Sequence, residues 1–310
     1  MPYAIEARHL ARHFGDVKAV EGLDLQVPQG SIFGFLGPNG AGKTTTLHLL
    51  LGIVAPTAGS AQVAGFDVGT APGEVRRRCG ALLEHNGLYE RLSARENLDL
   101  HGRMHRMDAA DRAQRIRELL DQLGLWERRD DNVGTWSRGM KQQLAIARTL
   151  MHRPSIVFLD EPTAGHDPQA AAALRAQLPE LVRQDKTTIF LTTHNLHEAE
   201  QVCDRVAVIR AGRLLAVGPP GELRTGRQEQ VDVTGGPFPA RGLAALRKRK
   251  DIEAVEPVDG ALRLTLAPGS RLPAIVKAMI DAGMAVEEVR RVRASLEEDF
   301  LALVAAEASP

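Results

Sequence analysis

The sequence predicts an α/β fold with a mixed sheet at its core, an inserted helical subdomain and a small α+β domain at the C-terminal end. Three observations support this prediction. A glycine-rich loop at residues 37 to 45 follows an apolar run at 32 to 36. A second apolar run, at 156 to 159, ends in two acidic residues, and between the two runs, from about 90 to 152, apolar residues recur at helical spacing.

The loop after the first apolar run reads Gly-Pro-Asn-Gly-Ala-Gly-Lys-Thr-Thr. A buried strand that leads into such a turn and then into a helix is the context of a phosphate-binding loop. Its glycines let backbone N–H groups surround an anion, Lys43 reaches the β- and γ-phosphates, and Thr44 offers a hydroxyl to Mg²⁺. The sequence therefore predicts a nucleoside triphosphate site. Its expected residues are Gly37, Pro38, Asn39, Gly40, Ala41, Gly42, Lys43, Thr44 and Thr45.

The composition narrows the possible functions. With 39 basic and 39 acidic residues in a chain of 310, no global positive field favours nucleic acid, and we expect no nucleic-acid partner. Cys79 and Cys203 are too few for a disulfide scaffold or a metal cluster. The first residues lack the features of a signal peptide, and the apolar runs fall short of the ~20 residues that cross a bilayer. We therefore expect a cytosolic chain.

The acidic pair after the second apolar run points to phosphoryl transfer. Asp160 and Glu161 follow a predicted strand, at the sheet edge where doubly wound proteins bind ligands. We expect Asp160 to hold Mg²⁺, directly or through water, and Glu161 to polarise the attacking water. The alternative is that the pair caps a helix, and its position behind a phosphate loop favours the catalytic interpretation.

A second anion site is expected at Trp-Ser-Arg-Gly-Met-Lys-Gln-Gln, residues 136 to 143. This segment opens a predicted helix that runs to Leu150, with Ser137 as its N-cap. Small residues at a helix N-terminus suit an anion. Because one chain does not need two distant phosphate cradles, we expect the second one to serve a nucleotide held by another copy.

In this order the motifs resemble those of an ATP-binding-cassette (ABC) ATPase, over roughly residues 4 to 222. The resemblance implies a phosphate-loop NTPase cassette at residues 1–222, with a helical subdomain at about 90–152, that hydrolyses ATP with Mg²⁺. It also implies that two cassettes pair head to tail, each signature closing on the ATP of the other. The family signature then corresponds to Ser137, Arg138, Gly139 and Met140.

Three further roles follow from the resemblance. Asp167 fits the loop after the acidic pair, and His194 fits the switch histidine that contacts the γ-phosphate and keeps the attacking water aligned. Phe14 stands where an aromatic residue stacks on adenine. Two alternatives stay open: Phe14 belongs to the core, or His194 only caps the helix expected at 196 to 202.

The sequence also departs from the family pattern. Glu84 stands where a metal-contacting glutamine is common, which adds negative charge near Mg²⁺. Arg138 replaces the first signature glycine, Met140 replaces the glutamine, and His166 replaces a leucine. Ser137 and Gly139 remain, so we expect activity.

These variants, and the run from Leu88 to Leu98, resemble the ATPase subunits of bacterial ABC-2-type exporters, a group that includes daunorubicin-resistance and sodium-efflux systems. The resemblance implies a separate membrane permease, a coupling helix of which contacts the surface around residues 84 to 97. It implies a homodimer on the inner face of the cell membrane.

The C-terminal segment is expected to form an accessory α+β domain at residues 223–310. A Gly-Pro-Pro-Gly cluster at 218 to 221 marks the boundary, and short strands are expected at 230 to 234, 252 to 256 and 262 to 266, the last two joined by an Asp259-Gly260 turn. One helix should carry Leu272, Ile275, Val276 and Met279 on one face, and Ser295 with Glu298 should cap a final helix. The end of the chain resembles that of exporter ATPases, where this domain is regulatory or stabilises the dimer.

Two other functions compete with the exporter interpretation. One is a soluble, non-transport ABC ATPase that acts on ribosomes, DNA or protein complexes, although such proteins generally carry two cassettes or long insertions. The other is a module that binds ATP without hydrolysing it, against which Glu161 and His194 argue. Both basic runs, 76 to 78 and 247 to 250, are interpreted as solvated faces.

Overall fold

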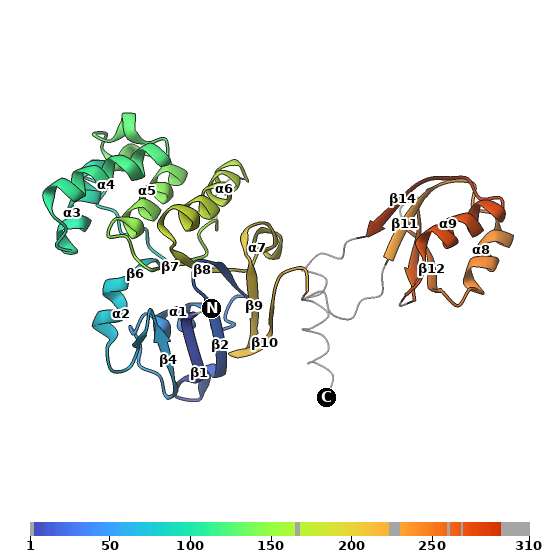
Figure 1. Cartoon of the computed structure of the whole chain (residues 1–310), viewed down its shortest axis with the longest axis horizontal. Helices are drawn as coiled ribbons and strands as arrows, with labels where there is room; N and C mark the ends of the chain where they lie inside the picture. The colour runs from blue at the N-terminus through green and yellow to red at the C-terminus, as the bar shows by residue number, and fades with distance from the viewer. Residues whose placement is uncertain (1–2, 165–167, 223–229, 259–260, 268, 293–310) are drawn as a thin grey trace. The chain divides into compact units, whose positions relative to one another are not determined.

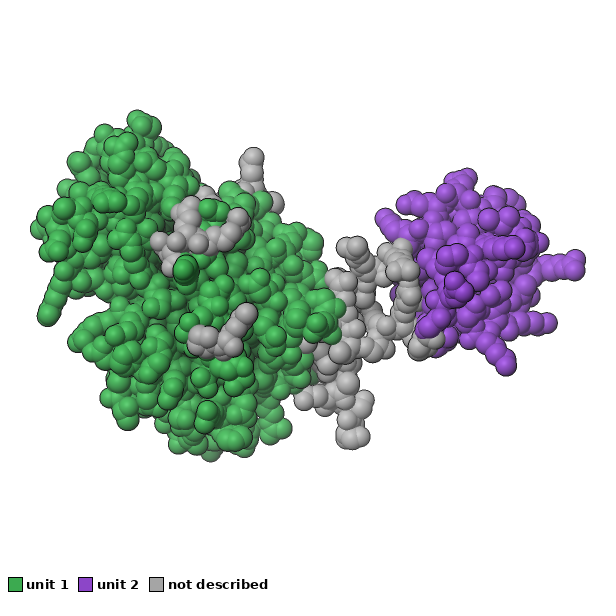
Figure 2. Space-filling view, viewed as in Figure 1, with its two compact units in different colours: residues 1–223, 303–310 green, residues 224–302 purple. Residues whose placement is uncertain are grey.

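The computed structural model describes residues 3–164, 168–222, 230–258, 261–267 and 269–292. They form two compact units, one within residues 1–223 and the other within 224–302 (Figure 2). The first unit contains the glycine-rich loop and the acidic pair.

A six-stranded mixed sheet forms the centre of the first unit, as the sequence predicts. In spatial order its strands are β10 (Arg213–Gly218), β9 (Arg205–Arg210), β3 (Ile32–Leu36), β8 (Thr188–Thr193), β7 (Ile156–Asp160) and β6 (Cys79–Leu82). All neighbours run parallel except β10 and β9. Strands β3 and β8 are buried along their whole length, which explains why they read as continuous rather than alternating apolar runs.

A four-stranded antiparallel sheet lies beside the central one. Its order is β2 (Val17–Pro28), β1 (Tyr3–Phe14), β4 (Ala58–Val63) and β5 (Phe66–Asp67). Helix α1 (Lys43–Leu50) contacts strands of both sheets, and its Leu47 and Leu50 share one buried core with Phe35 and Phe158. This packing fixes the start of α1, where the glycine-rich loop ends. Helix α2 (Pro72–Arg78) then leads into β6.

The helical subdomain occupies the chain between β6 and β7. It consists of α3 (Ala94–Met104), α4 (Ala109–Gln122), two short 3₁₀ turns (Trp126–Arg128 and Val133–Thr135) and α5 (Arg138–Leu150). In Figure 1 these helices, drawn in cyan and green, gather on the far side of the unit from β1 and β4. Helix α6 (Pro168–Asp185) and helix α7 (Leu196–Val202) complete the unit. Among the described helices, none has the length and apolar character that crossing a membrane requires.

The second unit is a four-stranded antiparallel sheet with two helices. Its elements follow the order β11 (Gln230–Gly235), α8 (Ala240–Arg247), β12 (Ile252–Val258), β13 (Ala261–Leu266), α9 (Leu272–Asp281) and β14 (Val286–Val292). The spatial order β12-β13-β11-β14 makes this a ferredoxin-like βαββαβ unit. Ile275 and Met279 of α9 are fully buried, as their helical spacing predicts.

Strand β14 was not predicted from the sequence. Its sequence, Val-Glu-Glu-Val-Arg-Arg-Val, is rich in charge and lacks a regular alternation of apolar and polar residues. Pairing with β11 decides its conformation. The expected Asp259-Gly260 turn and the final helix capped by Ser295 lie outside the described residues.

Candidate functional site

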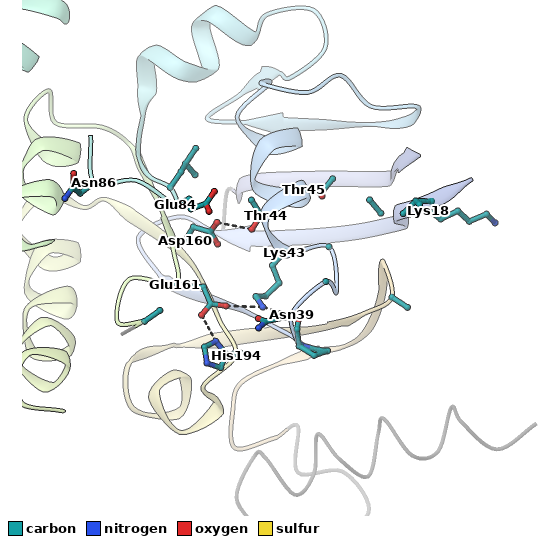
Figure 3. Close-up of a pocket in the computed structure, with 18 of the residues that line it drawn as sticks. Lys18, Asn39, Lys43, Thr44, Thr45, Glu84, Asn86, Asp160, Glu161 and His194 are labelled. Carbon is teal, nitrogen blue, oxygen red and sulfur yellow. Dashed lines mark hydrogen bonds and ion pairs between the residues drawn. The ribbon is translucent and has the colours of Figure 1, made fainter. Parts of the chain in front are cut away.

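A cleft of about 840 Å³ lies where the parallel strands of the central sheet end. The glycine-rich loop follows β3, the acidic pair ends β7 and His194 follows β8. Because these neighbouring strands are parallel, their C-terminal ends meet at one edge and bring the three segments together. Figure 3 shows their side chains around the cleft. Its lining includes Pro38, Asn39, Gly40, Gly42, Lys43, Thr44, Thr45, Asp160, Glu161 and His194.

Two glycines of the loop are required by close backbone approach. A Cβ at Gly37 would lie 2.4 Å from the carbonyl oxygen of Ile209, and one at Gly42 would lie 2.3 Å from that of Ala19. Gly42 is also the N-cap of α1, with a φ of 105° that other residues rarely adopt. Only glycine lets the loop turn this tightly into the start of α1, where backbone N–H groups are free to bind an anion.

Lys43 is buried at the base of this loop, with a side chain that is 6% exposed. Its ammonium group donates to the carbonyl oxygens of Gly37 (2.7 Å) and Pro38 (3.2 Å). It also lies 3.1 Å from Oε1 of Glu161. The loop lysine therefore joins the glycine-rich loop to the acidic pair (Figure 3).

Thr192, near the end of β8, orients both acidic residues. Its hydroxyl donates to Oδ1 of Asp160 (2.5 Å) and accepts from the backbone N–H of Glu161 (3.0 Å). The other carboxylate oxygen of Asp160 accepts from the Thr44 hydroxyl at 3.0 Å. Asp160 and Thr44 thus present hard oxygen atoms side by side, the donor type that Mg²⁺ prefers.

Glu161 has an unusual backbone. Its φ of 49° lies in the left-handed region, which costs about 1 kcal/mol or more for a residue other than glycine. Its N–H also donates to the Thr192 carbonyl at 3.1 Å, so β8 holds this conformation. Its Oε2 lies 2.5 Å from Nδ1 of His194. Glu161 therefore lies between Lys43 and His194, with its carboxylate at the cleft.

The residues present fit a triphosphate and a magnesium ion. Tight loop backbone, a buried ammonium group and the N-terminus of α1 suit phosphate oxygens. The Thr44 hydroxyl and the Asp160 carboxylate, 3.0 Å apart, suit Mg²⁺.

Of the four signature residues, one lines the cleft of its own chain and three do not. Ser137 caps α5 as predicted, accepting from the Met140 N–H at 3.3 Å. Arg138 lines the cleft of its own chain and donates to the Ala164 carbonyl at 3.2 Å. Ser137, Gly139 and Met140 do not line this cleft.

The other predicted residues differ in position. Glu84 lines the cleft from the loop that follows β6, and Asn86 lies nearby. Phe14 is 46% exposed, so it does not belong to the core. It does not line the cleft either. The Arg12 guanidinium lies 4.4 Å from the centre of its ring. Ala41 of the loop is buried away from the lining. Asp167 lies outside the described residues.

Several residues of the site were not predicted from the sequence. Thr192 could have been predicted from the sequence, because it lies at the end of the same strand, β8, that His194 follows. Gln142 of α5 also lines the cleft and donates to the Pro162 carbonyl at 2.9 Å. The start of β2 contributes Val17, Lys18 and Ala19, which no motif marks.

The chain is similar to known proteins in both sequence and fold. Residues 20–164 match the family described as ABC transporter. The chain is 39% identical to the daunorubicin resistance ATP-binding protein DrrA3 of Streptomyces coeruleorubidus, over 97% of this chain and 95% of the relative. It is 34% identical to the bacitracin transport ATP-binding protein BcrA of Bacillus licheniformis, over 98% of each.

A solved structure is similar as well. CbiO1 of Clostridium perfringens, part of the ABC transporter complex cbiONQ, aligns with a TM-score of 0.68 and 25% identity over 72% of this chain and 91% of that one. The similarity confirms the predicted cassette fold. The chain therefore belongs to the ABC transporter family, as an ATP-hydrolysing subunit of the ABC-2-type exporter group.

Proposed function

We propose that this chain drives export through a separate membrane permease by hydrolysing ATP, with Mg²⁺, at sites that two copies share. The observation that carries the proposal is the position of Glu161, which contacts Lys43 on one side and His194 on the other at the mouth of the phosphate loop. A carboxylate in this place can accept a proton from an attacking water.

The residues of the cleft divide the work. Backbone N–H groups of the loop and Lys43 bind the β- and γ-phosphates, and Thr44 and Asp160 hold Mg²⁺. Bound Mg²⁺ neutralises phosphate charge. Glu161 polarises the water, and His194 keeps it aligned, which is a positioning role. Phe14, whose ring is exposed, would stack on adenine by exchanging its contact with the Arg12 guanidinium for one with the base.

Two copies complete each site. Ser137, Gly139 and Met140 lie at the N-terminus of α5 but outside the cleft of their own chain. A helix N-terminus with a serine cap favours anions. This position supports a head-to-tail homodimer in which these residues close on the partner's ATP.

The conformational change that ATP hydrolysis drives would be transmitted to a permease. We place its contact at residues 84 to 97, because Glu84 lines the cleft and α3 begins at Ala94, so that the same segment joins the nucleotide to the helical subdomain. This arrangement puts the chain on the cytoplasmic face of the cell membrane. Residues 223–310 would form an accessory domain that regulates or stabilises the dimer.

In this proposal the permease selects the compound that is transported. The two relatives above are named for different compounds, daunorubicin and bacitracin, at 39% and 34% identity. The cleft described here contains groups for a nucleotide and for a metal, and these are the same whatever compound is moved.

A detergent pull-down tests the proposal. Tagged Glu161→Gln protein is recovered from its native host with ATP and Mg²⁺, and partners are identified by mass spectrometry. We expect a protein with several membrane spans at near-equal stoichiometry, and less of it with the Lys43→Ala control. Recovery of ribosomes, DNA or non-membrane proteins alone would instead favour the non-transport ATPase.

A further inference from the structure

Three histidine rings gather in the helical subdomain, outside the ATP cleft. His101 lies in the last turn of α3, His105 is the C-cap of the same helix, and His152 follows α5. One ring nitrogen from each lies within 4.8 Å of the other two. The ring of His105 is 3.7 Å from that of His152 and 4.7 Å from that of His101, centre to centre.

The hydrogen bonding of His152 leaves one nitrogen without a partner. Its Nε2 lies 3.2 Å from the carbonyl oxygen of Cys79, the first residue of β6. Because a carbonyl oxygen only accepts, Nε2 carries the proton and Nδ1 carries a lone pair. Nδ1 is buried and has no hydrogen-bond partner in the described structure. Such an atom is rare in folded proteins and calls for a partner.

A proton does not supply that partner near neutral pH. Burial lowers the pKa of His101 to about 3 and that of His152 to about 4, and the positive charge of Arg148 acts in the same direction. Burial also lowers the pKa of His105, and the neutral imidazole that a lowered pKa favours is the form that binds metals.

We propose that His101, His105 and His152 form a binding site for a divalent first-row transition metal of the zinc type. His101 and His105 are four residues apart on α3, the spacing that places two imidazoles on one helical face. The contact from His152 to the Cys79 carbonyl is the outer-shell hydrogen bond that usually orients a metal-binding histidine. Three imidazoles with one open position match a known zinc coordination set.

A fourth metal ligand could enter from a cavity beside the histidines. His105 and His152 line a cavity of about 750 Å³ whose wall also includes Arg76, Arg77 and Arg106. These cations favour an anion or a hydroxide as the fourth ligand. Such a ligand also offsets the repulsion that Arg148 and the arginines of this wall exert on a metal ion.

Binding requires one ring to turn. The planes of His105 and His152 are 12° from parallel, so their lone pairs do not converge on one point in this arrangement. His105 is half-buried at a helix end and faces the cavity, so its ring has room to rotate. An occupied site would link α3 and the end of α5 to β6 through Cys79, and so fasten the helical subdomain to the central sheet.

The test is zinc titration of the full chain labelled with ¹⁵N-histidine. We expect one zinc ion per chain, with shifts of the ring resonances of His101, His105 and His152 as zinc is added. Competition with a chelating dye should show at least a roughly tenfold loss of affinity in His105→Gln. The matched control is His197→Gln, which removes an exposed histidine of α7 and should bind zinc like the wild type.

A second control separates this site from the ATP cleft. His194→Ala removes the imidazole beside Glu161 and should keep the same zinc stoichiometry. The proposal is overturned if the wild type shows no saturable binding, or if zinc shifts only other histidines. It is equally overturned if folded His105→Gln retains wild-type affinity. Should that variant fail to fold, the ring resonances of the wild type decide.

Discussion

The ammonium group of Lys43 lies 3.1 Å from a carboxylate oxygen of Glu161. We propose roles in phosphate binding and in catalysis for these two groups, and in the cleft their opposite charges compensate each other. A triphosphate that enters the loop competes for the ammonium group, which weakens its hold on the carboxylate. In the proposed mechanism, nucleotide binding would therefore free the Glu161 carboxylate to accept a proton. This coupling gives the two residues distinct mutational signatures.

Lys43→Ala should remove high-affinity nucleotide binding. The substitution deletes the ammonium group at the base of the loop, which donates to the Gly37 carbonyl and pairs with Glu161. We expect the dissociation constant of a fluorescent ATP analogue to rise at least about tenfold, since a charge-assisted contact contributes about 1.5–3 kcal/mol. Unchanged affinity would contradict the assignment of the phosphate loop.

Glu161→Gln should bind ATP but hydrolyse it slowly. The amide keeps the shape of the side chain and cannot accept the proton of the attacking water. We expect turnover to fall by a factor of about 10² to 10⁴, the usual contribution of a general base. Phosphate release under saturating ATP measures it, with retained ATP binding as the control. Turnover close to that of the wild type would exclude Glu161 as the base.

Glu84→Gln should weaken Mg²⁺ binding slightly. Glu84 lines the cleft that holds Asp160, and the substitution removes one negative charge without changing shape. We expect the Mg²⁺ concentration for half-maximal ATPase activity to rise roughly two- to fivefold at low salt, and less at high salt because of screening. The control is Glu127→Gln, an exposed glutamate outside the cleft. If both substitutions had the same effect, the charge of Glu84 would have no specific influence on Mg²⁺ in the cleft.

Asp232→Asn should destabilise the C-terminal unit in a pH-dependent way. Arg263 donates to both oxygens of Asp232, at 2.8 and 3.0 Å, and this pairing holds the pKa of Asp232 below its ordinary value of 3.8. A lowered carboxylate pKa stabilises the fold above about pH 4, and that stability is lost as the pH falls through the folded-state pKa.

We therefore expect Asp232→Asn to cost about 1 kcal/mol at pH 7, and progressively less below pH 4. Urea unfolding of the full chain at pH 7 and pH 3 measures the difference, with amide exchange in β11 and β13 reporting on this unit. The control is Glu253→Gln on β12, which is exposed. A cost that stays constant down to pH 3 would show that Asp232 acts through packing rather than charge.

Some features of this site could be predicted because the residues of each motif are contiguous in the chain. The glycine-rich loop carries its own turn, lysine and helix start within nine residues, and the acidic pair directly follows its strand. Ser137 similarly caps the helix that begins at the next residue. In each case local backbone preference decides the structure, so the motif alone indicates the function.

Other features depended on residues far apart in the chain. Thr192 reaches Asp160 and Glu161 only because β8 pairs with β7 in one register, and β14 is a strand only because β11 pairs with it. His101 and His152 meet through the packing of α3 against α5. The sequence by itself determined the fold class, the nucleotide chemistry and the family. The tertiary structure alone decided which distant side chains share a site, because strand register and helix packing sum many weak contacts that no short motif encodes.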